Sequence, residues 1–299
     1  MISTGIKKFY DPTFVVSEQY RNSLPDLQNG PSSTIEGANV PIQQVGISNF
    51  KLPLKYPTPE GELLTLETSV DGYVGLDAGK KGINMGRIMR TFYRFKDDVF
   101  HPDKLESILR AYKEDLNSHT AFLQLSFNYP MIKKSLRSDY EGYQYYKVSL
   151  EGKLDEENRY TGFIHLDFEY SSACPCSFEL AEHARETRDL AAIPHSQRSV
   201  ANITVQLNEE MFIDDLVFMC REALQTETQV IVKREDEQAF AEMNGAYQKF
   251  VEDAARLMYD VLNEDDRIRD FVVRCAHLES LHSHDAVSRI CKGVVNGLR

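Results

Sequence analysis

Hydrophobic and polar residues alternate along several parts of this chain, with the period of two that is typical of β-strands. The alternation is clearest from Ile164 to Tyr170, where apolar residues hold the even positions and His165, Asp167 and Glu169 the odd ones. This pattern predicts a half-buried strand with His165 on its solvent side. Further strands are predicted over residues 40–54, 63–70, 123–127, 146–150, 200–207, 229–233 and 268–275.

Apolar residues three and four positions apart predict helices in the intervening segments. One helix begins at His101-Pro102-Asp103 and continues to Leu116, and another follows Asn208. The longest helix is predicted over residues 235–262, and residues 177–193 are expected to form a charged helix or a loop.

The glycine-rich segment from Asp77 to Gly82 has some likeness to a phosphate-binding P-loop. The spacing from Gly75 to Gly79 is one residue too short, however, and no Ser or Thr follows the lysine. A turn between two strands, over residues 73–76 and 83–92, is the better interpretation.

The order of the predicted elements indicates the fold class. In the second half of the chain the predicted order is strand, strand, helix, strand, helix, strand. None of these strands is followed by the glycine-rich turn of a dinucleotide-binding fold. We therefore expect an α+β protein in which helices pack on one face of a mostly antiparallel sheet.

Composition places the chain among globular proteins of one large or two moderate domains. It has 299 residues, of which 42% are hydrophobic and 27% charged. No apolar run is long enough to span a membrane, and the first residues lack the apolar core of a signal peptide. Five cysteines, an odd number, fit a reducing compartment, so we expect a cytoplasmic protein.

A net charge of −12 argues against non-specific binding to a nucleic acid, which needs a basic face that releases counterions. An anionic small molecule would instead need a local basic pocket. Two clusters of basic residues could supply one: Lys80, Lys81, Arg87, Arg90 and Arg94 in the first, and Arg185, Arg188, Arg198, Lys233 and Arg234 in the second. Taken singly, most of these charges are expected to be solvated.

Two thiols are separated by a single residue in Cys174-Pro175-Cys176. A disulfide across one residue would be badly strained, and redox dithiols or paired zinc ligands usually stand two residues apart. Pro175 disfavours helix at the residue before it, which predicts a turn between a strand and a helix with an exposed thiol. One thiol is then a metal ligand or a nucleophile; the alternative is a buried cysteine that simply packs.

Other polar residues could contribute to a site near this turn. His195 precedes a predicted strand and could bring an imidazole to the thiol. Glu237 lies at the acidic start of the long helix, where an acid favoured by the helix dipole is the plainer interpretation. Glu252 lies among apolar residues of that helix, and its carboxylate could accept the two adjacent N–H groups of a guanine base. His282 and His284 share a face if their segment is extended, although a surface pair is the alternative.

Five motifs, in order, resemble those of the type IB GTP cyclohydrolases. They are Cys174-Pro175-Cys176-Ser177, His195-Ser196-Gln197-Arg198, Lys233-Arg234-Glu235-Asp236-Glu237, Phe250-Val251-Glu252-Asp253 and Glu279-Ser280-Leu281-His282-Ser283-His284-Asp285, with weaker echoes at residues 41–46 and 82–87. Together they cover nearly the whole chain. Members of this family convert GTP to 7,8-dihydroneopterin triphosphate and formate, the first step of tetrahydrofolate and pterin biosynthesis.

The resemblance implies a tunnelling fold (T-fold). In this fold two tandem modules, each an antiparallel sheet with helices on one face, assemble into oligomeric barrels with active sites at subunit interfaces. We therefore expect an N-terminal arm over residues 1–40, a first module over 41–155 and a second over 156–299 that carries most site residues. A homo-oligomer, with a tetramer as the expected state, is implied as well.

The resemblance also assigns a metal centre by position. A divalent ion, Fe²⁺, Mn²⁺ or Zn²⁺, is expected at Cys174, His195 and Glu237. Such an ion lowers the pKa of a water molecule toward neutrality and so prepares it to attack the purine ring. Cys174 and His195 are therefore expected to be catalytic.

Four further roles follow from position. Glu252 is expected to anchor the guanine, while Glu279 and His282 are expected to be acid–base or metal-proximal partners. A proton donor that titrates near pH 7 is needed, and His282 or His195 could supply it. Arg198 is the first candidate to balance the triphosphate of GTP.

The chain departs from the family pattern at three points. The segment between Cys176 and His195 is longer, which makes His183 a competing ligand, and Asn84 and Gly86 stand where the N-terminal motif has His and Ser. A changed metal preference, a variant substrate or lost activity would each account for this. The alternatives are a related enzyme on a guanine-like substrate that makes a cyclic phosphate product, and a catalytically silent oligomer that binds a purine or pterin. A nitrile reductase is disfavoured because its Glu-Ser-Lys-Ser-type run is absent.

Overall fold

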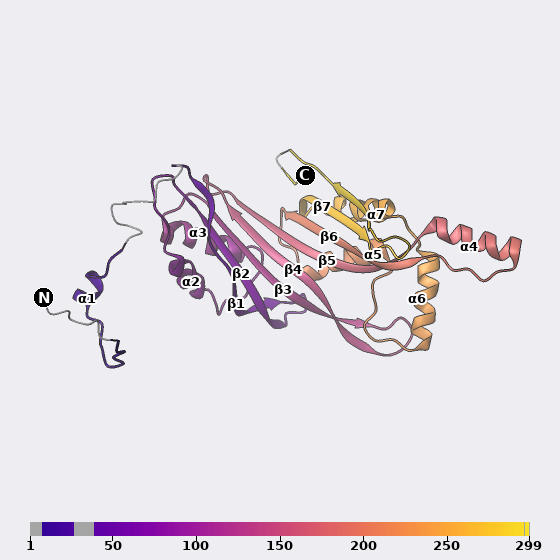
Figure 1. Ribbon diagram of the computed structural model, residues 1–299, viewed down its shortest axis with the longest axis horizontal. Helices are drawn as coiled ribbons and strands as arrows, with labels where there is room; N and C mark the ends of the chain where they lie inside the picture. Colours follow the sequence, from indigo (N-terminus) through magenta and orange to yellow (C-terminus); the bar gives the residue numbers. More distant parts are fainter. Residues whose placement is uncertain (1–7, 27–38, 296, 299) are drawn as a thin grey trace.

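The computed structural model describes residues 8–26, 39–295 and 297–298. Its centre is an antiparallel sheet whose eight strands lie in sequence order from β1 to β8 (Figure 1). The first four strands are β1 (Ile42–Pro57), β2 (Leu63–Leu76), β3 (Ala121–Lys134) and β4 (Glu141–Leu154). The last four are β5 (Tyr160–Ala173), β6 (Ser196–Leu207), β7 (Ile268–His277) and β8 (Ala286–Cys291).

Helix α1 (Glu18–Asn22) precedes the first strand, and the other helices lie in the longer connections between strands. They are α2 (Met85–Tyr93) and α3 (Lys104–Leu116) before β3, α4 (Pro175–Arg188) before β6, and α5 (Ile213–Leu224), α6 (Arg234–Ala246) and α7 (Val251–Asn263) before β7. No helix in the described part of the chain is long and apolar enough to cross a membrane.

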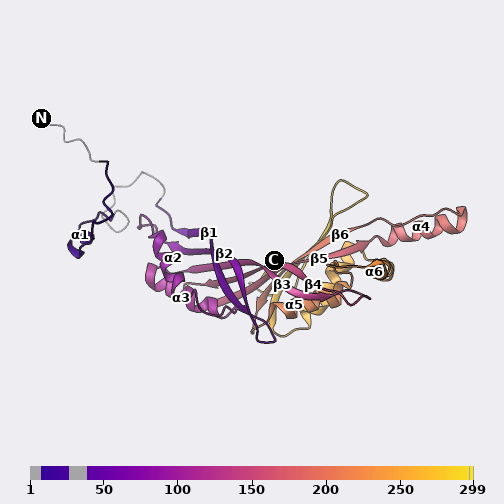
Figure 2. The same ribbon diagram turned by 90° about the horizontal axis from the view of Figure 1, so that it is seen from below.

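One face of the sheet is apolar across both halves of the chain. The strand register aligns Val70, Leu125, Leu150, Ile164, Val205 and Phe271 in one row, and each is at most 2% exposed. Helices α2, α3, α5 and α7 pack on this face and share one hydrophobic core with it. Figure 2 shows α2, α3 and α5 on the same side of the curved sheet. The α+β class and the one-sided packing of helices are therefore confirmed.

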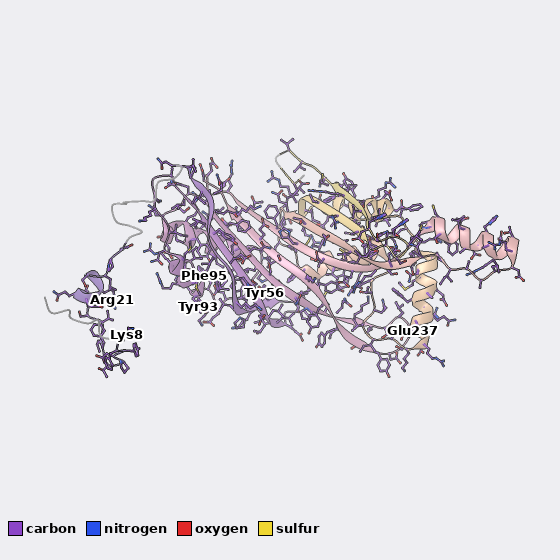
Figure 3. All side chains as sticks on the ribbon, viewed as in Figure 1. Lys8, Arg21, Tyr56, Tyr93, Phe95 and Glu237 are labelled. Atoms are coloured by element: carbon purple, nitrogen blue, oxygen red, sulfur yellow. The ribbon has the colours of Figure 1, made fainter. Side chains whose placement is uncertain are left out.

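The core leaves little free space between the sheet and the helices of the first half. A Cβ atom at Gly72 would lie 2.9 Å from the hydroxyl of Tyr112 and 3.1 Å from Ile88, so α2 and α3 approach β2 closely because this residue is glycine. Tyr56, labelled in Figure 3, is 1% exposed, and its hydroxyl hydrogen-bonds that of Thr68 at 3.0 Å. Packing against the sheet thus holds the helices in place.

The opposite face of the sheet is polar. Ser69, Ser126, Ser149, His165 and Thr204 are paired residue to residue across the strands, and part of this face lines a hollow of 430 Å³. His165 hydrogen-bonds Thr204 at 2.9 Å and a carboxylate oxygen of Glu151 at 2.8 Å. His165 therefore lies on the face without helices, as its position in the alternation predicts.

The two halves of the chain repeat one order of elements. β1, β2, α2, α3, β3 and β4 match β5, β6, α5, α7, β7 and β8, with α4 and α6 added in the second half. The halves are joined by the antiparallel pairing of β4 with β5, whose connecting turn has Asn158 at a φ of +62°. Figures 1 and 2 both show α4 extending away from the sheet.

The strand predicted over residues 83–92 is instead helix α2. Asn84 is its N-cap and accepts a hydrogen bond from the backbone N–H of Arg87 at 3.2 Å. Ile88, Thr91 and Phe92 are buried at the spacing of a helix. Over so short a segment, the periodicity of apolar residues does not distinguish a helix from a buried strand, which is why the prediction was wrong. The glycine-rich segment is thus a turn between a strand and a helix.

The long helix predicted over residues 235–262 is broken into α6 and α7. The break falls at residues 247–250, where the backbone N–H of Lys249 leaves the helical pattern and donates to the carbonyl of Ala173 at 3.3 Å. The prediction failed because the apolar stripe continues across the break. The alternation of apolar residues does not reveal a tertiary hydrogen bond of this kind.

Three smaller expectations also differ from the structure. Residues 229–233 do not form a strand, and the carbonyl of Ile231 accepts a hydrogen bond from the side chain of Ser135. Helix α5 begins at Ile213 rather than at Asn208, and β8 was not predicted. Of the arm expected over residues 1–40, residues 1–7 and 27–38 lie outside the described part of the chain.

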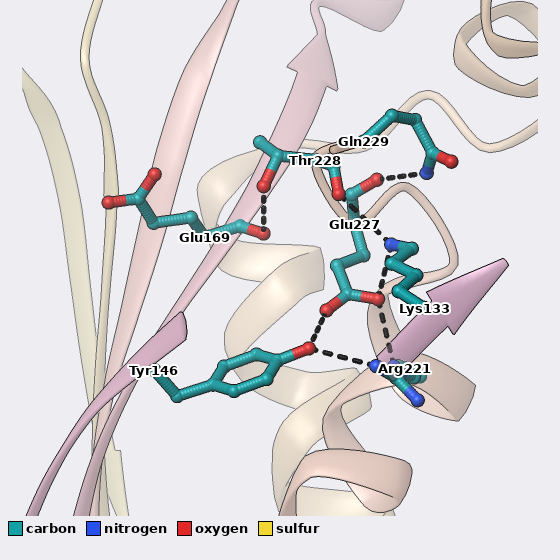
Figure 4. A network of polar contacts seen from close by, with 7 residues as sticks. All are labelled: Lys133, Tyr146, Glu169, Arg221, Glu227, Thr228 and Gln229. Atoms are coloured by element: carbon teal, nitrogen blue, oxygen red, sulfur yellow. Dashed lines mark hydrogen bonds and ion pairs between the residues drawn. The ribbon is translucent and has the colours of Figure 1, made fainter. Parts of the chain in front are cut away.

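A buried ionic network joins the two halves. Glu227, which is 5% exposed, accepts hydrogen bonds from Lys133 of β3 at 2.5 Å, from Arg221 of α5 at 2.8 Å and from the hydroxyl of Tyr146 of β4 (Figure 4). Lys133 also donates to the carbonyl of Thr228 at 3.0 Å. One carboxylate thus faces two cations, and burial lowers the pKa of Lys133.

The variant Glu227→Gln should lower the free energy of unfolding by about 3 kcal/mol, because it leaves two partly buried cations without a counter-charge. Urea denaturation measures this difference. The matched control is Glu222→Gln on the exposed side of α5, which should stay within about 0.5 kcal/mol of wild type. Equal stability of the two variants would contradict a structural role for the network.

Candidate functional site

Cys174 and His195 lie next to each other where β5 and β6 end. Cys174 is the N-cap of α4, with φ −75° and ψ 121°, and Pro175 occupies the first helical position. Ala173 pairs with Ser196 in the ladder between the two strands, and the backbone N–H of Cys174 donates to the carbonyl of His195 at 3.2 Å. Helix α4 and the loop of residues 189–194 separate the two residues in sequence, and the pairing of β5 with β6 brings them together.

The neighbours of His195 define the tautomer of its imidazole. The Gln197 side-chain amide donates from Nε2 to Ser172 Oγ at 2.7 Å, so its Oε1 is the atom that accepts from Nδ1 of His195 at 3.0 Å. Ser172 in turn shares a hydrogen bond with Ser199 at 2.8 Å. In the neutral imidazole this hydrogen bond places the proton on Nδ1, and Nε2 then has the lone pair that a metal ion would need.

Glu279 places a carboxylate beside the same imidazole. Its Oε2 lies 3.5 Å from Nδ1 of His195, and the two side chains are 13% and 17% exposed. That oxygen is buried without a hydrogen-bond partner, and an unsatisfied carboxylate oxygen is costly to bury. His195 thus meets Cys174 through the backbone and Glu279 through its imidazole, and Glu279 keeps one oxygen without a hydrogen-bond partner among the described residues.

The structure distinguishes the two histidines that follow the Cys-Pro-Cys motif. The segment between Cys176 and His195 contains α4, which extends away from the sheet, and the chain then returns to place His195 just before β6. His183 is exposed on α4, nine residues beyond Cys174 and therefore about 13 Å further along the helix axis. His195, and not His183, is brought beside Cys174.

The other predicted residues are more exposed. Glu237 is exposed in the first turn of α6 (Figure 3). Glu252 is exposed in the first turn of α7, which corrects its predicted position among apolar residues inside a longer helix. His282 stacks on His284 with ring centres 4.8 Å apart in an exposed loop. Arg198 is exposed and lies 3.6 Å from a carboxylate oxygen of Glu169.

No three-ligand cluster forms around Cys174 within the described residues. One group of His, Cys, Asp and Glu side chains there brings three ligand atoms within 4.8 Å of one another, and it consists of His101, Asp103 and Glu210. Glu237 therefore does not join Cys174 and His195 within one copy of the chain.

Buried polar residues that sequence reasoning missed lie behind this corner. His277 is 4% exposed, and its Nε2 shares a hydrogen bond with the hydroxyl of Tyr170 at 3.1 Å. Burial, together with the nearby charge of Lys249, lowers the pKa of His277 to about 4, so this histidine is neutral at pH 7.

Lys249 ties the α6–α7 connection to the Cys174 corner. Its backbone donates to Ala173, and its ammonium donates to Thr226 Oγ1 at 3.2 Å and to the carbonyl of Tyr247 at 2.5 Å. Burial lowers the pKa of Lys249 to about 8. Lys249 directly precedes the Phe250–Asp253 motif. This position next to a motif was the one feature of the sequence that could have pointed to Lys249.

Solved structures share the fold of this chain. A crystal structure of uricase from Arthrobacter globiformis matches with a TM-score of 0.53 and 10% sequence identity, over 90% of this chain and 98% of that chain. A hyper-thermostable uricase mutant matches with a TM-score of 0.54 and 10% identity, over 89% and 96%. At this identity the likeness shows the fold alone, an antiparallel α+β architecture of the tunnelling-fold type.

Sequence relatives identify the family. Residues 24–288 match the family described as type I GTP cyclohydrolase folE2. GTP cyclohydrolase FolE2 of Dinoroseobacter shibae is 55% identical over 97% of this chain and 80% of its own length, and that of Ruegeria sp. is 54% identical over the same shares. The chain belongs to the FolE2 family of type I GTP cyclohydrolases.

The buried lysine should affect stability at high pH. In the folded chain Lys249 releases its proton near pH 8, whereas in the unfolded chain it does so near 10.5. Between these values the unfolded state binds more protons, so the free energy of unfolding rises with pH, by at most about 3 kcal/mol.

Urea denaturation at pH 8, 9 and 10 should show this rise in wild type and its loss in Lys249→Met. Lys134→Met is the control, because its side chain is 81% exposed. A pH dependence in Lys249→Met equal to that of wild type would contradict the assignment.

Proposed function

We propose that the Cys174–His195 corner is the hydrolytic centre of a metal-dependent GTP cyclohydrolase I of type IB. The enzyme converts GTP and water to 7,8-dihydroneopterin triphosphate and formate, the first step of pterin and tetrahydrofolate biosynthesis. The observation that carries this proposal is the backbone pairing that places Cys174 beside His195, with Glu279 next to that imidazole, in a chain of the FolE2 family.

The residues present fit a divalent ion of borderline character. A thiolate, an imidazole nitrogen and a carboxylate form a donor set that Zn²⁺, Fe²⁺ and Mn²⁺ share to differing degrees. Cys174 and His195 would hold the ion. Glu237, which is exposed on α6, is the third ligand that we propose, and it would come from another copy of the chain. Glu279 lies beside Nδ1 of His195 rather than beside Nε2. When bound, the ion would lower the pKa of water so that hydroxide forms near neutral pH.

The chain's own residues account for the remaining steps. Gln197 holds the imidazole of His195 in one tautomer and orientation, which keeps Nε2 directed away from the strand. Glu252 at the exposed start of α7 would accept the paired N–H groups of the guanine. Opening the five-membered ring requires a proton on the leaving nitrogen, and His282 in its exposed loop is the residue that we propose as its donor.

The site would be completed by a second copy of the chain. We propose two tandem modules, residues 41–155 and 156–299, whose boundary lies in the turn between β4 and β5, and their assembly into a homo-oligomer, with a tetramer as the expected state. Helix α4 and its return loop support this, because Leu180, Leu190 and Ile193 are exposed there. A reducing, cytoplasmic setting fits the five cysteines, all of which are free thiols.

Substitution of the two neighbouring thiols tests the proposal. Cys174→Ala should abolish the formation of formate and of fluorescent pterin from GTP, whereas Cys176→Ala, which removes an exposed thiol two residues away, should stay close to wild type. His195→Gln should lose at least about a hundredfold in kcat. Full activity of Cys174→Ala, assayed without oxygen with Fe²⁺, Mn²⁺ or Zn²⁺ supplied, would refute the assignment of the centre.

A further inference from the structure

A hollow on helix α2 is lined mainly by arginines. Arg87, Arg90 and Arg94, together with Thr91 and Asp115, enclose a volume of 350 Å³. The three arginines lie on neighbouring turns of one helix face and span about 10 Å of its axis. Tyr93 on the same helix, labelled in Figure 3, is 44% exposed, so this part of α2 borders solvent.

The lining carries uncompensated positive charge. Asp115 is its single carboxylate, and one of its oxygens accepts from Arg94 at 2.8 Å and from Thr91 at 2.5 Å. Arg87 donates to the backbone carbonyl of Asp115 at 2.8 Å, so its charge remains unpaired. The side chain of Arg90 makes no hydrogen bond or ion pair with any described residue. Three guanidinium groups against one carboxylate leave a charge of +2, in a chain whose net charge is −12.

Local structure holds these arginines in place before any ligand arrives. Arg87 and Arg94 are both fixed by Asp115, and the N-terminus of α2 is fixed by the Asn84 cap. A Cβ atom at Gly86 would lie 3.1 Å from Nη1 of Arg90, so glycine leaves room for this guanidinium. Asn84 and Gly86, which we expected to depart from the family motif, thus both lie at the start of this helix.

The chemistry of the hollow favours a polyphosphate. Guanidinium forks match the oxygens of phosphate groups, and a row of three along about 10 Å suits several linked phosphates better than one. At the Cys174 corner, Arg198 lies 3.6 Å from a carboxylate oxygen of Glu169, and Lys249 is buried. We propose that Arg87, Arg90 and Arg94 form a binding site for a chain of two or more phosphate groups.

The position of the site allows two sources for this ligand. Figures 1 and 2 show α2 near one end of the sheet and α4, which begins at Cys174, at the other. A single chain therefore cannot use both places for one GTP molecule. The phosphates belong either to GTP bound at the Cys174 corner of a neighbouring copy, which rests on the proposed function, or to a free polyphosphate.

Calorimetric titration of the full chain, stripped of metal, with inorganic triphosphate tests the site directly. Arg90→Gln should weaken binding about tenfold or more, as expected when one charge-assisted contact is removed. Arg110→Gln is the matched control, because this arginine on α3 pairs with Glu106 outside the hollow, and it should bind as wild type does. No binding by wild type, or equal binding by wild type and Arg90→Gln, would overturn the proposal.

Steady-state kinetics with GTP then assigns the source. If the site holds the substrate of a neighbouring copy, Arg90→Gln raises KM about tenfold with little change in kcat, and triphosphate competes with GTP. If the ligand is a free polyphosphate, KM is unchanged and triphosphate does not compete. Both outcomes support the site. Wild type that binds triphosphate but releases no formate from GTP would refute the proposed function and leave the binding site standing.

Discussion

The antiparallel pairing of β5 with β6 is the constraint on which the site depends. It places the end of one strand against the start of the next, so that Cys174 and His195 meet although a helix separates them in sequence. The same register directs Gln197 and Ser199 inward, where they orient the imidazole and meet Ser172. A shift of one residue in this pairing would turn every side chain to the other face and dismantle the corner.

The rest of the molecule holds that pairing rigid. A sheet with one apolar face carries helices from both halves, and the Glu227 network links β3 and β4 to α5. Behind the corner the chain buries a neutral histidine, His277, and an ammonium, Lys249, that pairs with no carboxylate among the described residues. Burying such groups costs stability, and buried groups with shifted pKa values are typical of functional sites.

Much of the sheet could be predicted from the sequence, since apolar alternation survives wherever one face is buried, as from Ile164 to Tyr170. The motifs around Cys174 and His195 likewise located the corner. Prediction failed where tertiary contacts decide, and the Lys249–Ala173 hydrogen bond that interrupts the long helix is one example. Glu252 was misplaced as a consequence. Glu279 was expected from its motif, but the role of Gln197 as a partner of the imidazole and the unpaired side chain of Arg90 follow from three-dimensional packing that no local pattern encodes.

The central claim is that this corner opens the imidazole ring of GTP by metal-assisted hydrolysis. The most direct measurement is mass-spectrometric identification of the products formed without oxygen by the metal-stripped protein resupplied with Fe²⁺, Mn²⁺ or Zn²⁺. The account predicts one formate for each 7,8-dihydroneopterin triphosphate, with the linear triphosphate intact. A cyclic phosphate product, or GTP recovered unchanged with every metal from folded protein, would contradict it.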